Sequence, residues 1–201
     1  MALSKIDVAN MLTGVAPVAN GGTGLSSGTT DQFLKFTGST TLASAADNAG
    51  ITVAGQWRWT VSRQNDYTPI SADWEEVDTQ YSRVGSAMTQ SSGVFTFPST
   101  GVYFITYQTY FNAAVGETEI NALIQHTTNN GGAWSDNTKF ACGEANDGGY
   151  VGGYGSTVID IGDVSNHKVR FTVDMSNTAT NMIGDSSRNQ VAVTFIRLGD
   201  T

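Results

Sequence analysis

The stretch from Ser92 to Asn112 constrains the fold of this chain more than any other. It reads SGVFTFPSTGVYFITYQTYFN, and its aromatic and β-branched residues favour extended strands. One interruption, from Pro98 to Gly101, consists of residues that commonly form turns. The stretch therefore predicts a central hairpin of two strands joined by a tight turn.

The second of these predicted strands carries large side chains on both of its faces. Because successive residues of a strand point in opposite directions, its residues divide into two sets. One set is Tyr103, Ile105, Tyr107, Thr109 and Phe111, and the other is Val102, Phe104, Thr106, Gln108 and Tyr110. Both sets are largely apolar or aromatic, so we expect a central strand of a two-sheet sandwich that also packs against a neighbour.

The predicted hairpin also resembles the signature of the complement-type globular head, a relative of the tumour-necrosis-factor jelly roll. The residues that match the family's spacing are Phe95, Gly101, Tyr103 and Tyr107. The chain departs from the pattern at Ile105, where the family prefers Phe, and at Val77, Arg83 and Met88. The ending Phe195–Asp200 resembles the family's closing strand, which extends the resemblance over most of residues 56–201. The resemblance implies an all-β jelly-roll β-sandwich that assembles as a homotrimer.

The rest of residues 56–201 shows regularly spaced strand patterns separated by turn residues. Trp57, Trp59 and Val61 alternate with Arg58, Thr60 and Ser62 as in a half-buried first strand. Further strands are predicted over 118–128, 156–161, 169–175 and 190–198, with a turn at 129–132. The apolar spacing within 70–88 also fits a helix, but the resemblance favours extended segments there. Residues 133–150 are interpreted as an acidic loop. This pattern is typical of a jelly-roll sandwich.

Composition limits the partners of the chain. Charged residues make up 14% of its 201 residues, and the formal net charge is −8. Nucleic acids and anionic membranes need clustered Lys and Arg, so neither is an expected partner. No apolar run approaches the ~20 residues of a membrane span, so no membrane insertion is expected. The single cysteine, Cys142, excludes an intrachain disulfide and a zinc site built on cysteines.

Residues 1–55 differ in composition from the remainder. A short helix is possible over 1–13, and two strands, 32–36 and 40–44, are expected to pair. Large apolar residues are too few to form a core, so we expect order only where identical copies run side by side. The phrase VAPVANGGTG at 15–24 resembles shaft and linker segments of bacteriophage tail fibres; a flexible linker is the alternative. We predict a fibre shaft or linker segment over 1–55, which joins other tail proteins, and a head domain over 56–201.

Two groups of carboxylates are candidates for catalytic or metal-binding sites. Glu117 and Glu119 lie two residues apart, and Glu75, Glu76 and Asp78 form a cluster. An opposed pair of carboxylates would serve a glycosidase, and clustered oxygen ligands would suit calcium. Neither group has a spacing that specifies these sites, and we interpret both as solvated surface.

Nucleophilic and phosphate-binding chemistry also find little support. Cys142 is interpreted as a small buried residue, not as the partner of His126 or His167 in a Cys–His pair. The glycines of 21–24 and 148–155 lack the Gly-Lys-Ser/Thr or strand-to-helix context of a phosphate loop. We therefore expect no catalytic residue, no metal and no cofactor.

The segment 129–155 is the predicted receptor-binding surface because Tyr, Trp, Asn and Gly are typical of binding loops. The candidate residues are Trp134, Asp136, Asn146, Asp147, Tyr150 and Tyr154. Alternatively, the glycines of this segment allow close backbone approach within a strand, and the loop 177–189 binds the receptor instead.

Together these features predict a virion structural protein, the trimeric tip of a phage tail fibre, that binds a host cell-surface receptor, expected to be a glycan. A complement-type head that acts as a bacterial surface adhesin is the alternative. A capsule-degrading enzyme is the third and least supported class.

Overall fold

The computed structural model describes residues 32–38, 41–45, 50–79, 81–143 and 145–201. The predicted helix over 1–13 and the phrase at 15–24 lie outside these residues. The chain divides into two units, one ending at Gly50 and one from Ile51 to Thr201. In the first unit β1 (Phe33–Gly38) pairs antiparallel with β2 (Thr41–Ala45), which confirms the predicted strand pair.

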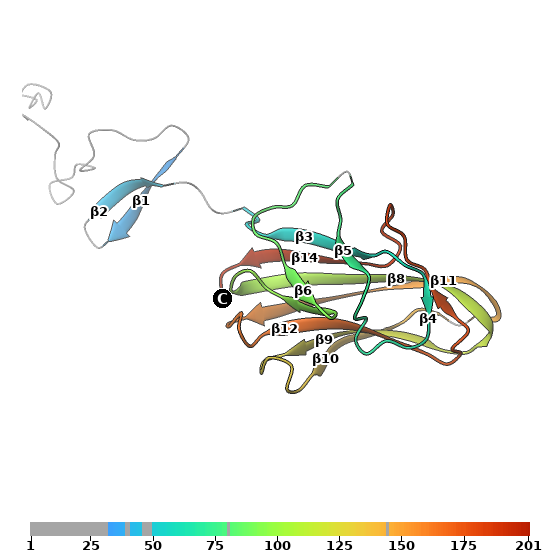
Figure 1. Cartoon of the computed structure of the whole chain (residues 1–201). Coiled ribbons are helices and arrows are strands. Elements are labelled where there is room, and N and C mark those ends of the chain that lie inside the picture. Colours follow the sequence, from blue (N-terminus) through green and yellow to red (C-terminus); the bar gives the residue numbers. More distant parts are fainter. Residues whose placement is uncertain (1–31, 39–40, 46–49, 80, 144) are drawn as a thin grey trace, which may run out of the picture. The chain divides into compact units, whose positions relative to one another are not determined.

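The second unit is a sandwich of two antiparallel sheets stacked face to face (Figure 1). The five-stranded sheet has the order β10 (Ser135–Ala141), β9 (Ile120–Thr127), β12 (Lys168–Met175), β7 (Val94–Thr96) and β6 (Thr89–Ser91). The seven-stranded sheet has the order β4 (Arg63–Gln64), β13 (Asn181–Met182), β8 (Gly101–Glu117), β14 (Ala192–Gly199), β3 (Ala54–Trp59) and β5 (Trp74–Glu76). Its remaining strand, β11 (Ala145–Ile161), pairs with the other edge of β8. No described residue is helical, so the predicted all-β jelly-roll class is confirmed, including the extended reading of 70–88.

An aromatic core fills the space between the sheets. Phe95 on β7 lies at its centre, with four rings 5.4 to 5.6 Å from its own: Trp57, Trp74, Phe171 and Phe195. Of the two residue sets predicted for this strand, the one that is buried in β8 is Tyr103, Ile105, Tyr107, Thr109 and Phe111. Their neighbours on the opposite face, from Val102 to Tyr110, are only partly buried. One face of β8 therefore packs on the core, and no other described element of this unit forms a layer over the opposite face.

The predicted central hairpin is wrong. β7 and β8 belong to different sheets, because β7 pairs with β6 and β12 while β8 pairs with β11 and β14. The chain crosses between sheets at residues 97–100. Gly101 has φ +138°, and a Cβ there would collide with Arg197 and with the carbonyl of Gly199. This glycine serves a crossover between sheets, not a turn within one of them.

The loop predicted over 133–150 is also wrong. Ser135–Ala141 forms β10, and β11 begins at Ala145 and runs without a break through its glycines to Ile161. β11 pairs with β8 over its whole length, from Ala145 opposite Glu117 to Ile161 opposite Gly101. Pairing with so long a strand overrides the weak strand propensity of the glycines.

The predicted alternation of the first strand holds only in part. Trp59 is buried, but Arg58 is also buried, and Val61 lies beyond the end of β3 and is exposed. Arg58 is buried because Glu75 on the paired strand β5 and Asp78 beyond it neutralise its charge.

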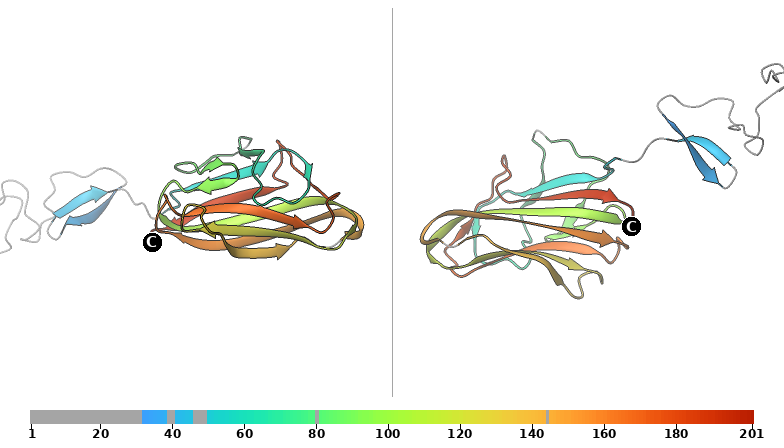
Figure 2. Two further views of the ribbon diagram at one scale, coloured as in Figure 1. Left: turned by 60° about the horizontal axis from the view of Figure 1, so that its bottom comes forward. Right: turned by 180° about the vertical axis from the view of Figure 1, so that it is seen from behind.

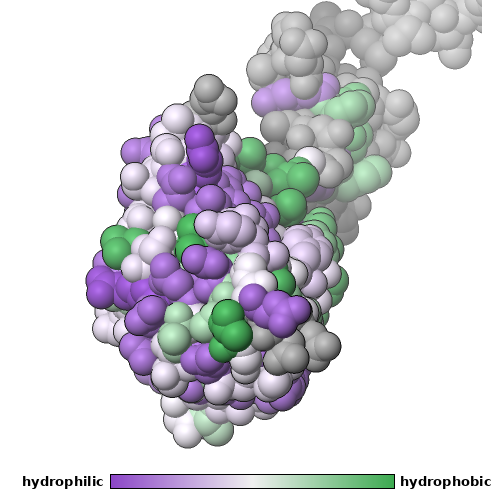
Figure 3. Space-filling view, turned by 90° about the vertical axis from the view of Figure 1, so that its right-hand side faces the viewer, coloured by the Kyte–Doolittle hydropathy of each residue, from purple (hydrophilic) through white to green (hydrophobic). Residues whose placement is uncertain are grey.

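The sandwich has two different ends. Ile161 and Gly101 lie at the end where the C-terminus is found, together with the turns at 128–134 and 162–167 (Figure 2). Glu117 lies at the opposite end, where the longer connections 60–73 and 176–190 gather. Figure 3 shows that hydrophilic residues cover most of this opposite end, with hydrophobic residues in separate small groups.

Candidate receptor-binding site

The structure separates the six predicted site residues onto two sheets. Trp134 and Asp136 lie at the start of β10 in the five-stranded sheet, near the end that holds the C-terminus. The other four, Asn146, Asp147, Tyr150 and Tyr154, lie on β11 in the seven-stranded sheet. Tyr150 pairs with Asn112 towards the opposite end of the sandwich. Only Trp134 and Asp136 are therefore brought together.

Trp134 and Asp136 form a cluster with two residues of neighbouring strands. The guanidinium of Arg170 on β12 lies over the Trp134 ring, with Cζ 4.3 Å from the ring centroid. Arg170 Nε donates a 2.7 Å hydrogen bond to Gln125 Oε1, and Gln125 Nε2 donates a 2.6 Å hydrogen bond to Asp136 Oδ1. Because Asp136, Gln125 and Arg170 are register partners across β10, β9 and β12, the sheet itself sets their spacing.

The turn at 129–132 lies close to the Trp134 ring. Thr127 Oγ1 accepts hydrogen bonds from the amides of Asn129 and Gly131, and Asn130 and Gly131 have positive φ angles of 55° and 93°. A Cβ on Gly131 would lie 3.7 Å from the indole. The predicted turn is confirmed, and it positions the Trp134 ring against Arg170.

The two aromatic side chains of β11 are both exposed. Tyr150 is 68% exposed and Tyr154 is 60% exposed. The Tyr150 ring stacks on Tyr110 of β8, with centroids 5.6 Å apart and planes at 10°. Asp147 is exposed near the start of this strand. These residues lie on the uncovered face of the seven-stranded sheet or at its edge.

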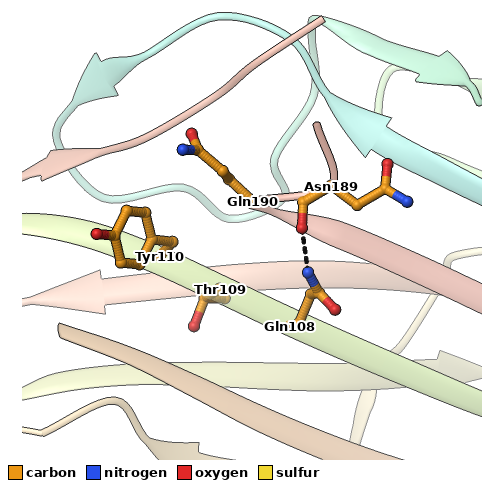
Figure 4. A pocket seen from close by; sticks show the side chains of 5 residues that line it. All are labelled: Gln108, Thr109, Tyr110, Asn189 and Gln190. Atoms are coloured by element: carbon orange, nitrogen blue, oxygen red, sulfur yellow. Dashed lines mark hydrogen bonds between the residues drawn. The ribbon is translucent and has the colours of Figure 1, made fainter. Parts of the chain in front are cut away.

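The same face contains a polar pocket of about 360 Å³ (Figure 4). Gln108, Thr109 and Tyr110 of β8 line one side, and Asn189 and Gln190, which precede β14, line the other. Gln108 Nε2 donates a hydrogen bond to the carbonyl of Asn189. The side-chain oxygens Asn189 Oδ1 and Gln190 Oε1 are buried and accept no hydrogen bond from any residue that the structure describes.

Next to the pocket, the outer face of β11, β8 and β14 has three register rows without a charged side chain. The rows are Val158–Phe104–Ile196, Ser156–Thr106–Thr194 and Tyr154–Gln108–Ala192. Val158 is 57% exposed, and Phe104 and Ile196 are partly buried. This charge-free face is the uncovered side of the strand that was predicted to need a neighbour.

The carboxylates of the 75–78 cluster are paired with arginines. Arg58 contacts Glu75 and Asp78, each at 2.6 Å, and Arg83 contacts Glu76 at 2.8 Å. Hydrogen bonds from Thr79 and Arg58 lower the pKa of Asp78. Paired in this way, the cluster offers neither an opposed catalytic pair nor an oxygen cage for calcium.

Glu117 is buried, which contradicts its interpretation as solvated surface. Burial alone would raise the pKa of its carboxyl, but hydrogen bonds from Ser176 and Thr180 and from backbone amides outweigh it, so the pKa is lowered. The backbone amides are those of Glu119, Ser176 and Asn177. The carboxylate therefore anchors the 176–180 segment.

Cys142 is buried, as predicted, and its Sγ lies 3.1 Å from Thr109 Oγ1. Burial raises the pKa of the thiol to about 11, although the hydrogen bond to Thr109 opposes this. The two histidines lie together, with the His126 and His167 rings 5.0 Å apart. Cys142 lies at the other end of β9, where its amide donates a hydrogen bond to the carbonyl of Ile120. A thiol that stays protonated is a poor nucleophile.

No group of three or more His, Cys, Asp or Glu side chains within the described residues is arranged to hold a metal ion. In the same part of the chain, no helix is long and apolar enough to span a membrane.

Sequence reasoning missed Gln125 and Arg170. Both lie on predicted strands, 118–128 and 169–175, to which no site residue was assigned. A signal was present, because the confirmed turn at 129–132 returns Trp134 towards the strand that contains Gln125. That Arg170 lies next to them depends on the pairing of β9 with β12, which the sequence does not show.

Comparisons with known proteins show the fold. No family model matches the chain, and no curated protein matches it. The crystal structure of murine APRIL at pH 5.0 has a TM-score of 0.55 and 12% identity, and the match covers 73% of this chain and 98% of that chain. The structure of Eiger TNF from S. frugiperda has a TM-score of 0.50 and 11% identity, with 76% and 96% covered. The head is therefore a tumour-necrosis-factor-like jelly roll.

Proposed function

We propose that the chain is the receptor-binding head of a homotrimeric phage tail-fibre tip, located in the virion, and that it binds a glycan on the host cell surface. The observation that carries this proposal is the uncovered, charge-free face of β11, β8 and β14. A two-sheet sandwich has an outer face on each sheet, and the absence of charged side chains on this part of the seven-stranded sheet is typical of an interface.

Charge favours another copy of this chain as the partner for this face. With a net charge of −8, two copies repel each other wherever their charged surfaces meet. The rows from Val158 to Ile196 and from Tyr154 to Ala192 avoid this repulsion because they carry no charge. A heterologous contact between the β11 edge of one copy and the sheet of the next closes into a ring when the rotation between copies is one third of a turn.

The pocket beside these rows supports the same assembly. Asn189 Oδ1 and Gln190 Oε1 are buried acceptors without a donor among the described residues, and each unsatisfied group of this kind costs ~1–3 kcal/mol. A neighbouring copy supplies donors at this face, for example from the exposed hydroxyl of Tyr154 on its edge strand.

Receptor binding is assigned to the Trp134 cluster. An aromatic face beside hydrogen-bonding side chains suits a sugar, whose ring has an apolar side and whose edge carries hydroxyls. A non-enzymatic role fits the carboxylates, which are paired with Arg58 and Arg83 or bound within the 176–180 segment. Three weak sites on one axis raise the avidity by ~100-fold or more.

The tail-fibre assignment rests on the sequence at 15–24. In this proposal residues 1–55 form the fibre segment and join the head to other tail proteins. Purified chain should label host cells and block adsorption of the phage that encodes it. The Trp134→Ala variant should keep its melting temperature and lose both effects. A chain that neither labels cells nor competes with the virion contradicts the proposed function.

A further inference from the structure

We propose that the cluster of Trp134, Arg170, Gln125 and Asp136 binds a carboxylate-bearing sugar, a sialic or uronic acid residue of the receptor glycan. This inference rests on the proposed function and adds the chemical class of the ligand.

The cluster is held in place before any ligand arrives. Arg170 is held by Gln125 at 2.7 Å and by the Trp134 ring at 4.3 Å, and Gln125 is held in turn by Asp136 at 2.6 Å. A guanidinium fixed in this way loses little side-chain freedom when it binds an anion. The site is therefore preorganised, which favours binding.

Arg170 has no ionic partner among the described residues, in contrast to Arg58, Arg63, Arg83 and Arg197, each of which pairs with a carboxylate. Its only hydrogen bond in that part of the chain is the one from Nε. Both terminal nitrogens of the guanidinium thus have no hydrogen-bond partner among the described residues. Partial burial lowers the pKa of Arg170, an effect that the charge of Asp136 opposes, and the group remains a cation.

The unused groups of the cluster specify the ligand. The two terminal nitrogens of Arg170 and the indole N–H of Trp134 are donors without a partner in the described residues, so the ligand brings acceptors. A carboxylate accepts two parallel hydrogen bonds from one guanidinium. Asp136 is exposed and has an oxygen left to accept a hydroxyl proton. Carboxylate and hydroxyl groups together on a ring describe an acidic sugar better than an acidic peptide.

Isothermal titration calorimetry on the purified chain tests this with two matched pairs of probes. The pairs are 3′-sialyllactose with lactose, and trigalacturonic acid with its methyl ester. One acidic saccharide should bind, and its neutral counterpart should bind at least ~10-fold more weakly. The pair that responds distinguishes a sialic acid from a uronic acid.

Variants locate the site. Arg170→Ala should weaken binding of the acidic saccharide ~10-fold or more, and Arg170→Lys should also weaken it because an ammonium lacks the bidentate geometry. Arg188→Ala is the matched control, since Arg188 is exposed and has no ion pair in the described residues. It should bind as the wild type does. Melting temperatures should show that all three variants are folded.

The contrary outcomes are distinct. Binding that survives Arg170→Ala, or is lost in Arg188→Ala alone, overturns the proposed site. Competition by poly-L-glutamate as effective as that by the saccharide overturns the sugar assignment. If neither acidic saccharide binds while the chain still labels host cells, this inference fails and the proposed function stands. A chain that binds an acidic saccharide but labels no host cell supports this site and contradicts the proposed function.

Discussion

The ring of Phe140 on β10 lies directly against the backbone of Gly155 on β11, so that no side chain can be placed between them. The same ring covers Gly153, where a Cβ would lie 2.9 Å from it. β10 and β11 are edge strands of different sheets, and Phe140 also contacts Tyr107 in the core. The glycines of 152–155 thus allow the sandwich to close along this edge, which favours the alternative reading of close backbone approach.

Gly155→Ala should destabilise the head by ~1–3 kcal/mol, the usual cost of overpacking a well-packed site. Gly162→Ala is the matched control, because nothing lies within 4 Å of a Cβ at that position. Urea unfolding followed by tryptophan fluorescence gives both free energies. Equal stability of the two variants would mean that Phe140 moves aside freely.

The alternation of apolar and polar residues predicted those features of the fold that depend on a single strand. The division of β8 into two residue sets, the strands over 118–128 and 169–175 and the turn at 129–132 follow from residue order, because alternation and turn residues are local signals. Strand pairing was not predictable in this way. β7 and β8 are adjacent in sequence and look like a hairpin, but each finds better partners far along the chain.

The candidate site was predictable only in part for the same reason. Trp134 and Asp136 are chemically conspicuous, and they do lie together. Arg170 is 34 residues beyond Asp136 and joins them only through the pairing of three strands. Arg58 was read as solvated because its partners Glu75 and Asp78 come from another part of the chain.

Glu117 should make the head sensitive to acid. Its pKa is lowered in the folded state, so its contribution to stability is complete above the ordinary Glu pKa and is lost as the pH falls through the folded-state value. Glu117→Gln should cost ~2 kcal/mol at pH 7, since hydrogen bonds to a charged group are lost. The cost should shrink in the acid range. Melting temperatures of both proteins from pH 7 to pH 3 test this, and a constant difference would contradict it.

Cys142 should be inert in the native head. With its pKa raised to about 11, the thiol is almost wholly protonated at neutral pH, and it is buried beside Thr109. An Ellman assay should show no reaction in buffer and one thiol per chain in denaturant. Rapid native reaction would reopen the Cys–His alternative.

Val158→Asp should dissociate the proposed trimer. Val158 is 57% exposed, so a carboxylate there is tolerated in a single chain, but it would place like charges together at the proposed interface. Val115→Asp is the control, since Val115 is 74% exposed near the far end of β8. Size-exclusion chromatography with circular dichroism should show a smaller, still folded Val158→Asp protein and an unchanged Val115→Asp protein.

Sedimentation equilibrium on the purified chain tests the proposed homotrimer most directly. At micromolar concentrations the mass should be three times the 21.2 kDa of one chain, and it should stay so on dilution, because the charge-free face and the buried oxygens of Asn189 and Gln190 are then covered. A mass of 21.2 kDa across the same range would show that this face remains open to solvent, and would contradict the trimeric head.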